Sequence, residues 1–258
     1  MNKKLITLAV AGALASPMFA VAADAPASPH TFTGNVTLAT EYLYRGIAQT
    51  AGDPALQGGF DYAHASGFYA GVWGSNISWL ENASVKSASL EVDIYGGYKG
   101  AITDDIGFDV GVLTYNYPGS LAPAMTNPNT AEVYGALSWK FLTLKYSRST
   151  TNLFGVANSK GSGYLELNAA YDLGEGWGIN GHVGHQNVKN NGFASYTDWK
   201  VGVTKDVGFG VVGLSYSTTN AEDSCSKGEW YCVQSRPGGA FNYEAGKGKA
   251  VLSFTKSF

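Results

Sequence analysis

The chain has 258 residues and a formal net charge of -3, with 13% aromatic and only 14% charged residues. Ordinary soluble domains have about 25% charged residues, and disordered chains are rich in charge and poor in aromatics, so the composition excludes intrinsic disorder. The net charge argues against a nucleic-acid-binding protein, which usually carries a basic face. After roughly the first 20 residues, no apolar run approaches the ~18 residues that a membrane-spanning helix needs.

The N-terminal segment has the features of a secretory signal peptide. Two lysines precede an apolar run from Leu5 to Ala15, and the small residues Ala20-Val21-Ala22 provide a cleavage site. The run is too short for the alternative, an N-terminal anchor helix. We therefore expect residues 1–22 to be a signal peptide that directs export, and residues 23–33 to be a periplasmic leader.

The rest of the chain is a series of segments in which apolar and polar residues alternate. In residues 90–95, for example, three aliphatic side chains alternate with Glu91, Asp93 and Tyr95. A period of two predicts β-strands, because successive side chains of a strand point to opposite faces. The pattern predicts twelve strands, at residues 34–45, 55–64, 67–77, 87–99, 105–116, 130–139, 141–149, 162–172, 176–187, 195–205, 207–218 and 247–258.

The connections between the predicted strands alternate between short turns and long loops. This asymmetry is typical of bacterial outer-membrane barrels, whose turns are periplasmic and whose loops are extracellular. A closed sheet also satisfies every backbone N–H and C=O group in lipid. We therefore expect residues 34–258 to form an all-β fold, a closed antiparallel transmembrane β-barrel of about twelve strands with short periplasmic turns and longer extracellular loops. The expected location is the bacterial outer membrane.

The last predicted strand ends in Phe258, and apolar residues occupy one of its faces except at Lys256. This ending resembles the C-terminal signal by which outer-membrane barrel precursors are recognised for insertion. The alternative is a terminal strand that ends in Phe without such a role. We expect Phe258 to act as the insertion signal, with the barrel-assembly machinery and outer-membrane lipid as partners.

Residues 41–50, Glu-Tyr-Leu-Tyr-Arg-Gly-Ile-Ala-Gln-Thr, followed by Ala-Leu-Gln-Gly at 55–58, resemble the TorF family, whose members are assigned as porins. Further similar stretches are residues 67–76 and 91–98, whereas the later strands match only in general pattern. The resemblance implies an outer-membrane location and a channel role. It carries over no substrate and no catalytic residue.

The alternation also assigns residues to the interior of the barrel. The acidic residues expected to line a pore are Glu41, Asp61, Glu91, Asp93, Asp109, Glu132, Glu166 and Asp198, and the basic ones are Arg45, Lys145 and Lys200. Glu91 and Asp93 would lie about 7 Å apart on one face. At an effective dielectric constant of about 20, two unit charges there repel by roughly 2.4 kcal/mol. Because dry burial of unpaired charge is costly, we expect a hydrated lumen.

Two points about the interior stay open at this stage. The interior could instead be closed by salt bridges, for example between Arg45 and Asp61. In the predicted strands 67–77 and 207–218, apolar side chains occur on both faces, so the pattern does not show which face points inward.

The two cysteines, Cys225 and Cys232, lie in the longest predicted loop, residues 219–246. In an exported protein this spacing favours a loop disulfide over a metal site, which would need more ligands nearby. The same loop holds Trp230 and Tyr231, which serve either as part of a binding surface or to fold the loop onto the barrel mouth as a partial plug. We expect no metal and no cofactor.

These features favour an outer-membrane porin-like channel for the passive diffusion of small polar solutes or ions. The alternative is a non-conducting structural or binding barrel. An enzyme of the outer-membrane phospholipase type would need a Ser–His pair near the outer rim, but His64 and Ser66 fall at a predicted periplasmic turn. We therefore expect no enzymatic activity, and an inward, hydrogen-bonding role for His182. Small polar solutes are the expected ligands, and nucleic acid is not.

Overall fold

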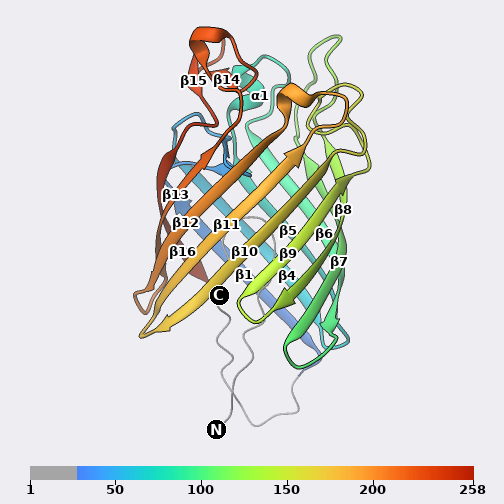
Figure 1. Ribbon diagram of the computed structural model, residues 1–258, viewed down its shortest axis with the longest axis vertical. Helices are drawn as coiled ribbons and strands as arrows, with labels where there is room; N and C mark the ends of the chain where they lie inside the picture. Colours follow the sequence, from blue (N-terminus) through green and yellow to red (C-terminus); the bar gives the residue numbers. More distant parts are fainter. Residues whose placement is uncertain (1–27) are drawn as a thin grey trace.

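The computed structural model describes residues 28–258, so the predicted signal peptide and residues 23–27 of the predicted leader lie outside the described residues. Within that range the chain is almost entirely β-structure (Figure 1). The barrel strands are β1 (His30–Ala39), β4 (Ala55–His64), β5 (Phe68–Asn76), β6 (Leu90–Ala101), β7 (Ile106–Asn116), β8 (Thr130–Trp139), β9 (Leu142–Ser149), β10 (Gly163–Gly174), β11 (Trp177–Asn187), β12 (Tyr196–Asp206), β13 (Val211–Thr219) and β16 (Lys249–Ser257). The shorter elements are β2 (Leu43–Tyr44), β3 (Ile47–Ala48), α1 (Trp79–Asn82), η1 (Gly192–Ala194), η2 (Cys225–Lys227), β14 (Cys232–Gln234) and β15 (Phe241–Glu244).

The twelve long strands form one closed antiparallel sheet. Their order around the barrel is β1-β16-β13-β12-β11-β10-β9-β8-β7-β6-β5-β4. The first strand closes the sheet, because β1 pairs with β4 on one side and with the C-terminal strand β16 on the other. Closure leaves no strand with unpaired N–H and C=O groups at an edge. The all-β closed antiparallel transmembrane barrel expected from the alternation is thus confirmed.

The outward face of the barrel is apolar. Large aliphatic and aromatic side chains project from it along every wall, and Val201 at the middle of β12 is 63% exposed. So much exposed apolar surface on a single chain is the lipid-facing band of a membrane barrel. Among residues 28–258, no helix is both long and apolar enough to cross a membrane.

The two ends of the barrel differ in the length of their connections (Figure 1). At one end, here the turn end, the strands are joined by residues 65–67, 102–105, 140–141, 175–176 and 207–210. At the other, here the loop end, the connections are residues 40–54, 77–89, 117–129, 150–162, 188–195 and 220–248. The small elements α1, β14 and β15 all lie at the loop end.

The structure settles the two strands whose inward face the sequence left open. On β5, Tyr69 and Trp73 point inward, where they contact Asp109 and Tyr42 respectively. On β13, Leu214 and Tyr216 are exposed on the outside, whereas Ser217 is buried. The inward face of β13 is therefore lined by small residues, and Phe209, which obscured the one-sided pattern in the sequence, lies in the turn before the strand.

The prediction for the first strand was wrong at both ends. The strand spans His30–Ala39 and not 34–45, so it begins within the segment expected to be a leader. Leu43 and Tyr44 do belong to a strand, but this strand, β2, pairs only with β3. The two form a separate short hairpin that is not part of the barrel wall. This difference determines the architecture of the interior.

Candidate functional site: a charged lumen crossed by a short hairpin

After β1 the chain leaves the barrel wall and forms a two-stranded hairpin at residues 43–48, here the lumen hairpin. Its turn consists of Arg45 and Gly46, whose φ angles are 47° and 77°. Positive φ at both central residues is the geometry of a type I′ turn, the usual connection of two-residue hairpins. A Cβ atom on Gly46 would lie 2.5 Å from Cγ2 of Thr219 and 2.9 Å from Cβ of Asp198. The turn is therefore seated directly against the inner wall.

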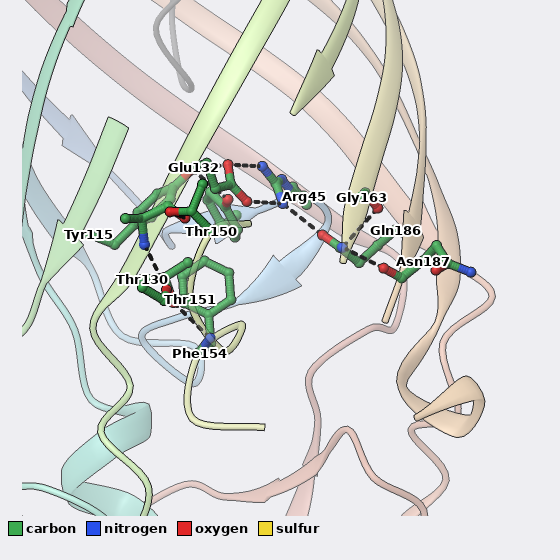
Figure 2. Close-up of polar contacts among 12 residues, drawn as sticks. Arg45, Tyr115, Thr130, Glu132, Thr150, Thr151, Phe154, Gly163, Gln186 and Asn187 are labelled. Atoms are coloured by element: carbon green, nitrogen blue, oxygen red, sulfur yellow. Dashed lines mark hydrogen bonds and ion pairs between the residues drawn. The ribbon is translucent and has the colours of Figure 1, made fainter. Parts of the chain in front are cut away.

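The lumen hairpin reaches across the barrel from the strand that carries it. The Arg45 guanidinium donates two hydrogen bonds to the Glu132 carboxylate on β8, at 2.8 and 3.1 Å, and one of 2.7 Å to Oε1 of Gln186 on β11 (Figure 2). In the order of strands around the barrel, β8 and β11 lie in the half opposite β1. The contacts of Arg45 therefore span the lumen.

The Arg45–Glu132 pair is buried and enclosed by tyrosines. The two side chains are 8% and 2% exposed. The guanidinium carbon lies 4.1 Å from the ring centroid of Tyr164 and 4.9 Å from that of Tyr44. Tyr115 donates a hydrogen bond of 3.3 Å to the same carboxylate. Because removing one partner of a buried pair leaves an uncompensated charge, this contact is a strong tie between hairpin and wall.

A second polar network lies beside the hairpin on β10, β11 and β12. Tyr164 donates to the Asp198 carboxylate at 2.8 Å, and Nε2 of His182 lies 3.0 Å from the same carboxylate. The amide of Asn168 donates to Glu166 at 2.8 Å, which orients its oxygen toward Nδ1 of His182 at 2.7 Å. Both ring nitrogens of His182 thus face acceptors, in keeping with the inward hydrogen-bonding role expected for this residue.

Tyrosine hydroxyl groups supply hydrogen bonds to the other inward carboxylates. The pairs are Tyr42 with Glu91 at 2.7 Å, Tyr95 with Asp61 at 2.6 Å, and Tyr69 with Asp109 at 2.6 Å. Asp93 differs, since its Oδ1 atom is buried and has no hydrogen-bond partner among the described residues. Among the described residues, these inward carboxylates therefore accept hydrogen bonds from tyrosines, whereas Oδ1 of Asp93 accepts none.

The structure turns most of the predicted lining residues toward the interior. Those on barrel strands are Asp61, Glu91, Asp93, Asp109, Glu132, Glu166, Asp198, Lys145 and Lys200. Lys145 shows the alternation clearly, because it is 6% exposed while its neighbours Leu144 and Tyr146 are 48% and 47% exposed on the outside. That these residues line a conducting pore stays a prediction.

Two predicted lining residues occupy different places from those expected. Arg45 lies in the hairpin turn, and Glu41 lies in the loop that leads to it, where the carboxylate accepts hydrogen bonds from the Gly52 N–H and the Tyr243 hydroxyl. Their placement on the first barrel strand was wrong because the wall ends at Ala39. The salt bridge between Arg45 and Asp61, considered as a way to close the interior, is not formed. Arg45 pairs with Glu132 instead.

The surroundings of Glu91 and Asp93 also differ from the expected water-filled lumen. Their side chains belong to residues that are only 2% and 8% exposed. Tyr42, from the segment that leads into the lumen hairpin, covers Glu91 and donates to it. A hydroxyl group of the infolded loop therefore stabilises the Glu91 carboxylate, whereas Asp93 has no such donor at Oδ1 from the described residues.

The long loop 220–248 packs onto the base of the lumen hairpin. Cys225 and Cys232 form the predicted disulfide. The Ala48 N–H donates to the Ala245 carbonyl at 2.9 Å, and Ala245 is fully buried. Burial and the neighbouring Glu41 carboxylate raise the pKa of the Tyr243 hydroxyl, which keeps it protonated as a donor. These contacts match the interpretation of this loop as a partial plug.

The lumen hairpin was not predicted, although the chain carries a signal for it. Arg45-Gly46 stands between Leu43-Tyr44 and Ile47-Ala48, and a glycine flanked by short apolar pairs is typical of a two-residue hairpin turn.

The pair considered for an enzyme, His64 and Ser66, lies at the exposed turn end of the barrel. Nδ1 of His64 is 2.6 Å from the hydroxyl oxygen of Ser66. The Ser66 N–H donates to the same nitrogen at 3.1 Å, so the contact caps a tight turn. In the described part of the chain, no group of three or more His, Cys, Asp or Glu residues is placed to hold a metal ion.

An apolar exterior, a charged interior and an infolded loop define the chain as a transmembrane β-barrel with a constricted lumen. The chain belongs to the family described as "Bacterial protein of unknown function (Gcw_chp)", which matches residues 23–258. No curated protein matches the sequence. The TorF family, which the motifs resemble, is not the family named by this match.

Solved porin structures share the fold of this chain. The KdgM porin superimposes with a TM-score of 0.54 at 8% sequence identity, over 88% of this chain and 99% of that one. The NanC porin superimposes with a TM-score of 0.51 at 11% identity, over 87% of this chain and 98% of that one. At such low identity the likeness shows the barrel fold alone.

Proposed function

We propose that the protein is an outer-membrane porin-like channel for the passive diffusion of small polar solutes or ions. The observation that carries this proposal is an apolar barrel wall around an interior of charged and tyrosine side chains. A barrel that served only as a membrane anchor would have no need of so many inward charges, because each must find a hydrogen-bond partner away from lipid. The fold shared with the KdgM and NanC porins supports the same function.

The proposed location is the bacterial outer membrane, with the loop end outside the cell and the turn end in the periplasm. The resemblance to the TorF family, the short turns at one end and the predicted signal peptide at residues 1–22 support it. The periplasmic leader, predicted at residues 23–33, then ends where β1 begins at His30, and Phe258 is the insertion signal for the barrel-assembly machinery. Outer-membrane lipid contacts the apolar exterior.

In this proposal the lumen hairpin is the constriction of the channel. Its Arg45 stands among acids from the wall, so a solute must pass a narrow region with charges of both signs close together. Such a lining selects solutes by size and by polarity, as charged constrictions do in other pores. One solved KdgM structure is described as a complex with disordered oligogalacturonate, and for the present chain the solute proposed is only a small polar one.

A non-conducting structural or binding barrel is the alternative, and the same hairpin favours it. If Arg45 never leaves Glu132, and loop 220–248 stays on the hairpin, the lumen is closed. The proposal includes no enzymatic activity. The contact between His64 and Ser66 is assigned to turn capping, since two donors of Ser66 converge on one ring nitrogen.

Electrical recording from purified protein in a planar lipid bilayer tests the proposed function. We expect discrete conductance steps for the wild-type chain, with a cation preference that falls as salt screens the inward acids. Heat-denatured protein from the same preparation is the control for leaks caused by detergent. A bilayer that contains folded barrels and stays silent at all voltages would favour the non-conducting alternative.

A further inference from the structure

A cavity of about 120 Å³ lies inside the barrel on the turn-end side of the lumen hairpin. Tyr42 and Tyr44 bound it toward the loop end, and Thr31 and Thr33 of β1 line it near the turn end. Much of its remaining wall is aromatic, with tyrosines and Trp73 from β4 to β8. Its volume is roughly that of four water molecules in the liquid, so it suits a solute of a few heavy atoms.

The cavity contains charges of both signs, and most are already engaged. Nζ of Lys145 lies 4.3 Å from the ring centroid of Tyr134, and Nζ of Lys99 lies 5.4 Å from that of Tyr69. Asp61 and Asp109 each accept a short hydrogen bond from a tyrosine hydroxyl group. These four charged groups therefore have neighbours of complementary character within the wall.

Asp93 is the charged group of the cavity that lacks a partner. It is 8% exposed, and its Oδ1 atom has no hydrogen bond in the described part of the chain. None of the ion pairs among residues 28–258 includes it. Its cross-strand neighbours are Trp73 on β5 and Tyr115 on β7, so aromatic rings flank the carboxylate on both sides.

We propose that this cavity is a binding site for a small organic ammonium ion, with Asp93 as the counter-ion and Trp73 and Tyr115 as aromatic walls. A buried carboxylate without a partner is costly, and a cation in the cavity next to Asp93 compensates its charge. The faces of aromatic rings attract cations as well. The inference deepens the proposed channel function by naming a solute class, and it rests on that function only for the route by which the solute arrives.

The same observations disfavour two other occupants. A hard metal ion needs several oxygen ligands, whereas the tyrosine hydroxyl groups of Tyr69 and Tyr95 are committed to Asp109 and Asp61. A neutral polyol could donate to Asp93 but would leave its charge uncompensated. An organic ammonium ion supplies the charge, the donors and the apolar surface together.

Isothermal titration of the folded protein in detergent tests the site without any need for conduction. The probes are ethanolammonium chloride and ethylene glycol, which are nearly equal in size and differ in charge, in a fixed background of potassium chloride. We expect saturable binding of ethanolammonium and none of ethylene glycol. Asp93→Asn should weaken the binding by about tenfold or more, because a charge-assisted contact is lost. Asp104→Asn, at an exposed turn, is the charge-matched control and should bind as the wild type does.

A second variant covers the case in which Asp93→Asn fails to fold. Trp73→Leu removes an aromatic wall and should weaken ethanolammonium binding by about threefold or more. Equal affinity for ethylene glycol, displacement by potassium ions alone, or unchanged affinity in both variants would overturn the site. Binding without conductance steps would instead leave the site standing and remove the channel function.

Discussion

Replacing Arg45 with alanine is expected to release the lumen hairpin and to raise the single-channel conductance. The change leaves Glu132 buried without its partner and removes the hydrogen bond to Gln186. Loss of one member of a buried pair costs about 3–5 kcal/mol, which corresponds to a docking constant lowered by roughly a hundredfold or more. Conductance steps in a planar bilayer should then be larger than those of the wild type, and permeation should extend to bulkier solutes.

Two further variants make this result specific to the hairpin. Arg148→Ala removes an exposed arginine from the outward face of β9 and should leave the conductance unchanged. Gly46→Val should act like Arg45→Ala, because its side chain cannot fit against Thr219 and Asp198 and because valine disfavours positive φ. An Arg45→Ala channel with wild-type conductance and wild-type solute cut-off would show that the hairpin is not the constriction.

Replacing Val201 with arginine is expected to destabilise the folded barrel in membranes by about 2–4 kcal/mol, the cost of arginine at the bilayer midplane of a β-barrel. Val201 lies at the middle of β12 and projects outward. The same substitution at Val207, in a turn at the end of the barrel, should cost only about 0–1 kcal/mol. Urea titration of both variants in lipid vesicles measures the difference. Equal stability of the two would argue that the middle of β12 does not contact hydrocarbon.

The fold could be predicted from the sequence because the barrel wall repeats one simple rule. Each strand alternates apolar and polar residues, as Leu144, Lys145 and Tyr146 do, and the lengths of the connections indicate which ends lie together. The ends of the strands were harder to predict. A strand ends where its backbone hydrogen bonds to the adjacent strands end, and the hydrophobic pattern does not show that position. Near β13 the alternation was obscured by Phe209, which lies in the turn before the strand.

The candidate site was predictable only in part, and Arg45 shows why. The alternation placed Arg45 on a wall strand, but the pattern is the same for a wall strand and for a hairpin inside the barrel. The partners Glu132 and Gln186 are far from Arg45 in sequence and meet it only because the barrel closes. Glu91 is covered by Tyr42, whereas Asp93 has no hydrogen-bond partner at Oδ1 among residues 28–258. This difference depends on side-chain directions, which an alternation with a period of two does not show.

A cysteine scan along β12 tests the central claim, a closed barrel with lipid outside and a polar lumen inside, most directly. Both native cysteines are held in a disulfide, so single engineered cysteines report alone. Cysteines at positions 200, 202 and 204 should react with a small water-soluble maleimide, whereas those at 199, 201 and 203 should not, because a thiol in hydrocarbon does not ionise to the reactive thiolate. Equal reaction of all six with the water-soluble reagent in intact membranes would contradict the account.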